Sequence, residues 1–408
     1  MLIDPKINMS INKLNLMLFF GLIGVCVGFY AWGNSADVGR LGLLLLLPLF
    51  WGLASSRLYA SALVIGYFLA SARGLPAGAA VFFGNGAPVW VGFVFWVVAC
   101  VLLSLPFIAL WSSSTLVRPW RFVIAVCVSI LPPLGLIGWV NPISTAGVYF
   151  PNVGWLGLIL TLGVMAALVA RHGKWIVVFG GISLLANLVF SASSNVKVPT
   201  DWRGVDTHFS GVSSAGSEDA GRILASMARI AWIKGYVESI PARSVRVLPE
   251  TLLGSFSGVA DYSLMGVNEK LAKRGSRLLV GAEMPQADGR YLNGLMVMGS
   301  GEHEMSFMAQ GVPVPVSMWK PWTGGGAVAN IFGGGSIKVE NVRAGVLVCY
   351  EQLLSFSVLK VMLSRPEVLV GVANVWWVKD PSIPAIQGQM LNVFGRLFAV
   401  PVIRAVNY

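Results

Sequence analysis

Two residues that can take part in covalent chemistry stand close together near the C-terminal end of the chain. The stretch VRAGVLVCYEQ, residues 342–352, ends an aliphatic run with Cys349, and Glu351 follows two positions later. Cys349 is either a core residue, as buried cysteines often are, or a nucleophile at a turn from strand to helix. In the second case, the N–H groups that begin the helix would favour the thiolate and could bind an oxyanion.

A thiol that attacks a carbonyl also needs a base. Glu250 ends a predicted strand in VLPETLLG, where a proline turn would present its carboxylate at the edge of a sheet. Taken alone, the same residue could instead be an acid at a helix N-terminus, beside Thr251. A Cys–His pair is an alternative, because the second half of the chain also contains His208 and His303, but neither histidine lies in a motif.

The sequence around these residues alternates short strands rich in β-branched residues with helical stretches, which predicts a sheet covered by helices. Residues 200–408 contain nineteen Lys and Arg and sixteen Asp and Glu, the charge balance of a soluble α/β domain. The predicted strands are 244–250, 276–285, 291–299, 344–351, 367–374 and 401–407, and the predicted helices are 353–364 and 385–400.

Residues 1–199 are predicted to form a separate transmembrane domain of about seven helices. The whole chain is 56% hydrophobic and 12% charged, whereas soluble domains carry about 25% charged residues. Several apolar runs reach the roughly 20 residues that cross a bilayer. The predicted spans are 14–32, 41–55, 58–72, 89–111, 121–140, 154–170 and 175–193.

The positive charges of this half predict the orientation of the spans. With the N-terminus in the cytoplasm, the inner loops carry seven Lys and Arg, and the outer loops between spans carry two. An odd number of spans then places residues 200–408 in the periplasm of a Gram-negative cell, anchored to its inner membrane. Most of the basic excess lies in the hydrophobic half, which counts against a nucleic-acid-binding face. No acidic residue lies within a predicted span, which counts against a proton-coupled transporter.

Three segments of the second half resemble, in order, the nitrilase superfamily. VLPETLL is similar to its glutamate motif, GVLVCYEQ to its cysteine motif, and VANVWWVKDPSIPAIQGQMLNVFGRLFAVPVIRAVN to the segment after the cysteine. The layout resembles the membrane-tethered apolipoprotein N-acyltransferases. The closer resemblance is to the nitrilase-like conjugal transfer proteins of the TraB family, which share the length, the apolar start and the segment VPVPVSMWKPW.

This resemblance implies an N-terminal multi-span α-helical membrane domain and a C-terminal α-β-β-α sandwich. It implies no cofactor and no metal, and it implies the lipid bilayer and conjugation proteins as partners. Nitrilase domains continue with further strands beyond the place where this chain stops, at Tyr408. The sandwich is therefore predicted to be trimmed, or the sequence truncated.

The resemblance also implies a Glu–Lys–Cys triad. In this triad Glu250 is the general base, Cys349 is the nucleophile that forms an acyl-enzyme from an amide or another acyl donor, and Glu351 is the supporting carboxylate. The implied function is that of a thiol-dependent amidase or N-acyltransferase. A non-catalytic membrane component of the conjugation apparatus and a true apolipoprotein N-acyltransferase are the alternatives.

The lysine of this triad is missing from its expected place. Alignment on GVPVP, residues 311–315, puts Met308 at the lysine position and Val316 at the position of a second glutamate of the acyltransferases. Lys320, in MWKPW, is the nearest substitute, and Lys338 is another. A thioether cannot hold the negative charge of a thiolate or an oxyanion, so catalysis would require another cation to reach the site.

Overall fold

The computed structural model describes most of the chain, and its residues divide into two compact units. The first unit comprises residues 1–195, 353–356 and 380–399, and the second comprises 196–352, 357–379 and 400–408. The first unit thus includes two segments from the half that the sequence assigns to the α/β domain. The described residues are 5–82, 89–192, 196, 198–199, 201–209, 220–256, 258–300, 305–376, 378 and 382–408.

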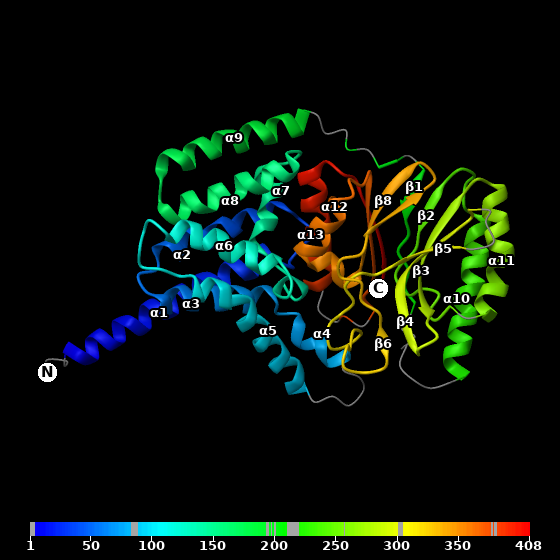
Figure 1. The fold of residues 1–408 in the computed structure, drawn as a ribbon, viewed down its shortest axis with the longest axis horizontal. Coiled ribbons are helices and arrows are strands. Elements are labelled where there is room, and N and C mark those ends of the chain that lie inside the picture. Colours follow the sequence, from blue (N-terminus) through cyan, green and yellow to red (C-terminus); the bar gives the residue numbers. More distant parts are fainter. Residues whose placement is uncertain are drawn as a thin grey trace. The chain divides into compact units, whose positions relative to one another are not determined.

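The first unit is made of helices, as its apolar sequence predicts (Figure 1). Ser56 caps one of them, because its side chain accepts a hydrogen bond from the backbone N–H of Tyr59 at 3.4 Å. Short 3-10 turns connect others, at Gly39–Leu45, Leu134–Leu136 and Pro142–Thr145. The α-helices are α1 (Pro5–Ala31), α2 (Leu46–Leu53), α3 (Arg57–Ser71), α4 (Leu75–Phe82), α5 (Val89–Ala109), α6 (Arg118–Ile130), α7 (Ala146–Tyr149), α8 (Gly154–Ala170), α9 (Gly173–Ala192) and α13 (Ser382–Phe398).

Glycines allow α1 and α3 to pack backbone against backbone. A Cβ atom built on Gly24 would lie 2.0 Å from the carbonyl oxygen of Leu63, and one on Gly28 would lie 2.4 Å from that of Tyr67. From the other side, a Cβ atom on Gly66 would lie 2.5 Å from a backbone oxygen of α1. The two helices therefore meet along a seam of small residues, a form of packing that is common between helices in membranes.

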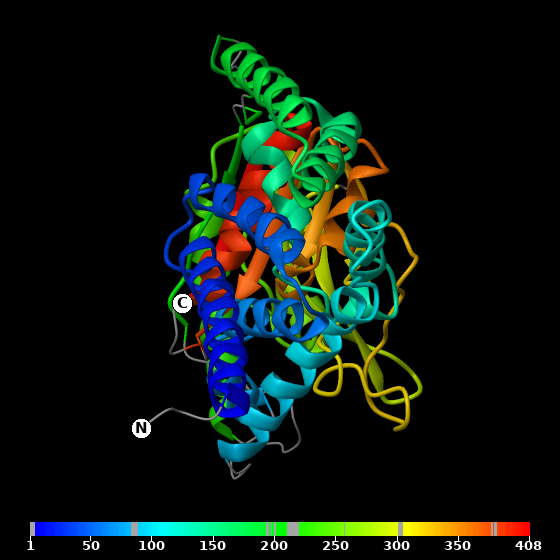
Figure 2. The same ribbon diagram turned by 90° about the vertical axis from the view of Figure 1, so that its left-hand side faces the viewer.

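Three of the described helices are long and apolar enough to cross a bilayer. They are Asn12–Ala31 within α1, Trp90–Ala109 within α5, and α9. The helices Pro142–Tyr149 and Gly154–Ala170 meet at a bend of 116°. They make a fourth candidate span only if the two are taken together as a single broken helix. Helix α9 contains no buried residue and lies alongside α8 (Figures 1 and 2).

The remaining predicted spans are shorter than a bilayer requires. The runs 41–55 and 58–72 fold into apolar helices that end at Leu53 and Ser71. The run 121–140 leaves the helical conformation after Ile130, where two prolines follow and cannot continue the backbone hydrogen bonds of the helix. Among the described residues, three helices, or four with the bent pair, are therefore long and apolar enough to cross a bilayer, against the seven predicted.

The second unit contains two mixed sheets. The first sheet has the order β1-β2-β3-β4-β5, in which β1 to β3 are parallel and β4 is antiparallel to both β3 and β5; β6 pairs in parallel with β4. The second sheet has the order β10-β9-β8-β7, in which β8 to β10 are parallel and β7 is antiparallel. The strands are β1 (Trp202–Gly204), β2 (Val245–Val247), β3 (Arg277–Pro285), β4 (Arg290–Met298), β5 (Ser306–Ala309), β6 (Gly326–Ala327), β7 (Ser336–Val339), β8 (Val342–Val348), β9 (Val368–Asn374) and β10 (Val402–Asn407).

The two sheets pack face to face, and helices cover their outer faces. One buried cluster joins residues of the first sheet, such as Leu279, to residues of the second, such as Val346. A second cluster joins the other face of the first sheet to α10 (Ala220–Glu238) and α11 (Gly258–Lys273), which lie side by side over it (Figure 1). Helix α12 (Ser355–Met362) covers the second sheet, where a Cβ atom on Gly345 would lie 2.5 Å from Cγ1 of Val361.

The order of these layers in the second unit is helix, sheet, sheet, helix, as the resemblance implies. The six predicted strands are present as β2, β3, β4, β8, β9 and β10, and the two predicted helices as α12 and α13. The sequence did not predict α10 and α11, because neither has a motif that distinguishes it from the loops around it.

Candidate functional site

Cys349 lies where β8 gives way to a short 3-10 helix, Cys349–Leu353. Its backbone has a φ of 46°, in the left-handed region that residues other than glycine seldom adopt. A conformation of this kind costs about 1–3 kcal/mol and persists where the surrounding structure holds it, often at functional sites. The side chain is 8% exposed and belongs to the core between the two sheets.

Glu250 lies beside this thiol. The chain leaves β2 and runs along β3, where the backbone N–H of Gly281 donates to the carbonyl oxygen of Pro249 at 3.1 Å. Glu250 is 4% exposed, and its carboxylate accepts hydrogen bonds from Nδ2 of Asn293 at 2.8 Å and from the backbone N–H of Asn374 at 3.0 Å. The thiol of Cys349 donates a further hydrogen bond to it. The structure thus brings the predicted base and the predicted nucleophile into contact.

A chain of amide side chains ties this carboxylate to the strand that carries the cysteine. Asn293 of β4 also donates from Nδ2 to Oε1 of Gln310 at 2.9 Å. Gln310 in turn donates from Nε2 to the carbonyl oxygen of Val348 at 2.9 Å, directly before Cys349. Because both amides are buried, their orientation is fixed, and they hold Glu250 and Cys349 at a set separation.

The electrostatic surroundings favour a neutral thiol in the resting state. Burial, and then the negative charge of Glu250, raise the pKa of Cys349 well above its usual value. Burial raises the pKa of Glu250 as well, while its hydrogen bonds to Asn293 and Cys349 oppose that shift. The arrangement is therefore a thiol that donates to a carboxylate, in which the carboxylate can take the proton as the sulfur attacks.

Glu351 is buried and binds the backbone at two places, just after β5 and at the end of β8. Its Oε1 accepts hydrogen bonds from the N–H groups of Gly311 and Val312 at 3.0 and 3.1 Å, and its Oε2 accepts one from Val348 at 3.1 Å. Burial raises the pKa of Glu351 to about 7, although the three N–H groups and the charge of Lys360 favour the anion. Glu351, the predicted supporting carboxylate, therefore fixes the backbone directly before Cys349 and the backbone that follows β5.

The residues expected to supply a cation are not in contact with the thiol. The side chains of Lys320 and Lys338 are exposed, and within the described residues Lys320 makes no side-chain hydrogen bond or ion pair. Val316 is also exposed, with a φ of 69°. Met308, at the expected lysine position, is buried in the same core cluster as Cys349.

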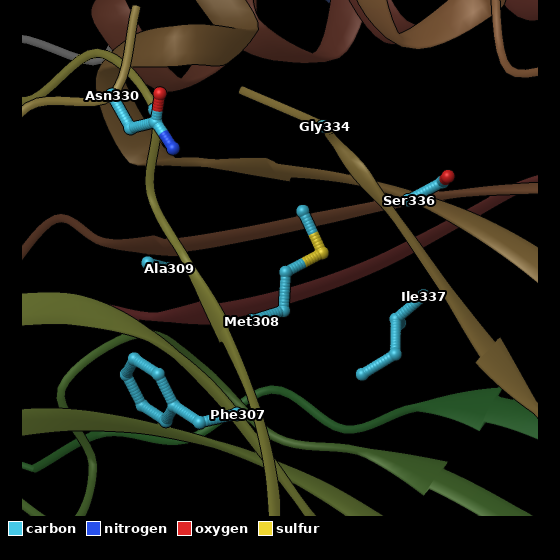
Figure 3. Close-up of a pocket in the computed structure, with 8 residues that line it drawn as sticks. Phe307, Met308, Ala309, Asn330, Gly334, Ser336 and Ile337 are labelled. Atoms are coloured by element: carbon cyan, nitrogen blue, oxygen red, sulfur yellow. The ribbon is translucent and has the colours of Figure 1, made fainter.

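A cavity of about 230 Å³ opens beside Met308. Figure 3 shows the thioether of Met308 among Asn330, Gly334 and Ile337. The cavity is lined by β5, by the loop before β7 and by the start of β7. Gly311 is also part of the lining, and a Cβ atom on it would lie 2.7 Å from Nζ of Lys360 and 3.2 Å from Oε1 of Glu351. Lys360 is thus the lysine that the structure brings near the glutamate of the cysteine motif.

His208 makes no contact with the thiol or with Glu250 in the described structure. The side chain of His208 is exposed, and its ring stacks on that of Tyr408 with centroids 5.7 Å apart. His303 lies outside the described residues. Within the part of the chain that the structure describes, the group paired with the Cys349 thiol is therefore a carboxylate and not a histidine.

Sequence reasoning missed four polar residues around the pair: Asn293, Gln310, Lys360 and Glu283. Asn293 and Gln310 had no motif, and Lys360 was read as part of an amphipathic helix. Glu283 did carry a signal, since it is a charged residue at the end of an otherwise buried strand. Glutamate side chains are almost never buried unless they are paired, so a buried one indicates a specific role.

No protein-family model matches the chain. A probable conjugal transfer protein TraB from Sinorhizobium fredii is 31% identical over 392 residues, which cover 95% of this chain and 97% of that protein. The conjugal transfer protein TraB from Agrobacterium fabrum is 32% identical over 407 residues, which cover 95% of this chain and 91% of that protein.

Two solved structures that are similar to this chain each cover half of it. A carbon-nitrogen hydrolase from Helicobacter pylori is 14% identical and covers 50% of this chain and 72% of its own, with a TM-score of 0.37. An amidase of the nitrilase superfamily from Nesterenkonia is 10% identical and covers 50% of this chain and 74% of its own, with a TM-score of 0.35.

Proposed function

Because the chain belongs to the TraB family of conjugal transfer proteins, we propose that it is a nitrilase-like, membrane-anchored component of plasmid conjugation with a thiol-dependent acyl-transfer site. The observation that carries this proposal is the contact between the Cys349 thiol and the Glu250 carboxylate at a strained strand-to-helix turn. A nucleophile paired with a base in this way is the minimal equipment for covalent catalysis.

In the proposed reaction the sulfur of Cys349 attacks the carbonyl carbon of an amide while Glu250 takes the thiol proton. The C–N bond then breaks, and the departing nitrogen takes that proton from Glu250, which leaves an acyl-enzyme. Water or a second amine attacks the acyl-enzyme, its proton passes to Glu250, and the proton returns to the sulfur as the S–C bond breaks. The N–H groups of Tyr350 and Asn374, which donate toward the thiol, support the sulfur as its charge develops.

The test of this function is the intact mass of the protein after exposure to acyl donors. We expect one acyl increment on the unchanged protein when no acceptor amine is present, because burial slows the attack of water on the thioester. Cys349→Ala should show no increment. Cys100→Ala is the matched control, since Cys100 is also buried but lies in α5, and it should be acylated as the unchanged protein is. An equal increment on Cys349→Ala, or none on the unchanged protein with any donor, contradicts the proposal.

The second candidate is a nitrilase fold that is kept for binding within the conjugation apparatus. It is supported by Met308 at the expected lysine position and by the exposure of Lys320. Plasmid transfer at the normal frequency by cells that carry Cys349→Ala would favour this candidate. A true apolipoprotein N-acyltransferase would instead sustain growth of cells depleted of their own acyltransferase.

We place residues 200–408 in the periplasm, with the lipid bilayer of the inner membrane as the first partner. With α1, α5 and α9 as spans and the N-terminus in the cytoplasm, the inner segments and span ends before residue 200 carry six Lys and Arg, and the outer ones carry four. Counting the bent pair as a fourth span would give five inside and five outside. The charge distribution therefore favours three spans, an odd number, which leads to the same orientation as seven.

A reporter fused after Tyr408 should be active only when it is exported. The full chain is needed, because the first unit includes residues 380–399. We expect alkaline phosphatase activity and no fluorescence from a cytoplasm-dependent fluorescent protein at this position. A fluorescent protein fused after Ser113, between α5 and α6, should fluoresce as the control. The reverse pattern at Tyr408 would mean an even number of spans and a cytoplasmic second unit.

A further inference from the structure

Strand β3 carries a buried carboxyl group that the proposed reaction does not use. Glu283 is 7% exposed, and its side chain has no hydrogen-bond or ion-pair partner within the ranges that the structure describes. Burial, and repulsion from Glu250, raise the pKa of Glu283 to about 7. A buried polar group without a partner costs free energy, so one in a native fold calls for an explanation.

Glu283 shares a face of the first sheet with Glu250. Side chains alternate along β3, so Glu283 points to the same side as Leu279, which lies in the core between the sheets. Between them Gly281 has no side chain, and a Cβ atom there would lie 2.4 Å from Cα of Glu250. Glu250 therefore sits over Gly281, and the two carboxyl groups are neighbours at one end of the layer between the sheets.

A second acceptor without a donor lies opposite Glu283. Asn293 is its direct partner in the antiparallel pairing of β3 and β4, and side chains in such positions are in contact distance. Nδ2 of Asn293 donates to both Glu250 and Gln310, which fixes the orientation of the amide. Its Oδ1 is buried and has no hydrogen-bond partner among the described residues. Two acceptors, of which Oδ1 of Asn293 is fully buried, thus occupy paired positions beside the thiol–carboxylate pair.

We propose that the carboxylate of Glu283 and Oδ1 of Asn293 form a subsite for a primary nitrogen of the substrate, either an ammonium group or a primary amide. Two acceptors call for at least two N–H groups on one nitrogen, which a primary amine offers and a quaternary ammonium or an ester oxygen does not. The subsite rests on the proposed function for its role: it holds the nitrogen that leaves in acylation or the amine that accepts the acyl group.

The charge of this subsite depends on pH. The titratable groups around Glu283 are Glu250 on the segment after β2, Tyr291 on β4 and, beside Glu250, Cys349. Since the pKa of Glu283 lies near 7, its carboxylate forms as the pH rises through neutrality, while an alkylammonium ion keeps its charge. Binding of the cation should therefore strengthen between pH 6 and pH 8.

The test uses methylammonium chloride with the full chain in detergent micelles, and tetramethylammonium chloride at the same ionic strength as the reference. The measured quantity is the midpoint of thermal unfolding. We expect methylammonium, at several times its dissociation constant, to raise the midpoint by about 2 °C or more at pH 8 and by less at pH 6. Tetramethylammonium should raise it at neither pH, and Cys349→Ala should respond as the unchanged protein does, since binding needs no acylation.

Glu283→Gln should abolish the methylammonium response and its pH dependence, while the control Glu269→Gln, on the exposed face of α11, should keep both. If Glu283→Gln fails to fold, Glu283→Asp, which withdraws the charge by one methylene group, should reduce the response. Equal responses to the two cations, or a response that persists in Glu283→Gln, overturn the subsite. So does the absence of any response, as would follow if a protonated Glu283 donates to Oδ1 of Asn293.

Acylation of Cys349, measured on the same protein, separates the two proposals. A methylammonium response without acylation by any donor contradicts the proposed reaction and leaves the subsite standing. Acylation without a methylammonium response overturns the subsite alone.

Discussion

A Glu250→Gln variant is expected to acylate Cys349 about 10²- to 10⁴-fold more slowly than the unchanged protein. The thiol of Cys349 is neutral at rest, because burial and the charge of Glu250 raise its pKa well above the usual value. The proton must therefore leave during the attack, and Glu250 is the group that accepts a hydrogen bond from this thiol. Glutamine keeps the shape of the side chain but cannot take the proton.

The measurement is the rate at which the acyl increment appears in the intact mass at a fixed donor concentration. Glu269→Gln, a change of the same chemistry on an exposed position of α11, should leave the rate unaltered. The midpoint of thermal unfolding, measured in parallel, shows whether Glu250→Gln keeps the fold. A folded Glu250→Gln variant with an unchanged rate would exclude Glu250 as the base.

Gly281→Ala is expected to destabilise the second unit by about 3 kcal/mol, near the upper end of what overpacking costs. A Cβ atom on Gly281 would lie 2.4 Å from Cα of Glu250, from the carbonyl oxygen of Pro249 and from the backbone nitrogen of Thr251. All three are backbone atoms, so no side chain can rotate to make room. The backbone that carries Glu250 must move, and acylation of Cys349 should fall with it.

The matched control is Gly266→Ala, in the interior of α11, where a Cβ atom would have no heavy atom within 4 Å. That change should be neutral or stabilising by up to about 1 kcal/mol, because alanine favours the helix more than glycine does. The midpoint of thermal unfolding in detergent distinguishes the two variants. If Gly281→Ala unfolds at the same temperature as Gly266→Ala, Glu250 is not held against β3 as described.

The sequence predicted most of the strands around Glu250 and Cys349, but it did not predict which polar residues lie next to these two side chains. Alternating and continuous apolar runs mark β3, β4, β8 and β9, and the motif resemblance singled out Glu250 and Cys349. What brings Asn293 opposite Glu283 is the register of β3 on β4, and a slip of β4 by one residue would turn Asn293 to the other face. Register depends on pairing between strands, so the run of residues within each strand does not reveal it.

The ends of the helices were a second feature that the sequence did not predict. Hydropathy marked apolar runs at 41–55 and 121–140, but mean hydropathy does not register where a helix stops. Helix α2 ends at Leu53, and α6 ends at Ile130, before two prolines. Lys320 was chosen as a cation for the site because it lies near the expected lysine position in the sequence. Nearness in sequence does not determine where a loop side chain points, and the side chain of Lys320 is exposed.

The hydrogen bonds of Glu351 couple the two layers of the sandwich mechanically. One carboxylate holds Gly311 and Val312, which follow the edge strand of the first sheet, and Val348, at the end of a strand of the second. Because Glu351 itself follows β8, sliding of one sheet past the other at this edge requires its two bonds to Gly311 and Val312 to break. The spacing of the two sheets beside Cys349 is therefore held by hydrogen bonds as well as by apolar packing, and a substrate that requires the sheets to part must break these bonds first.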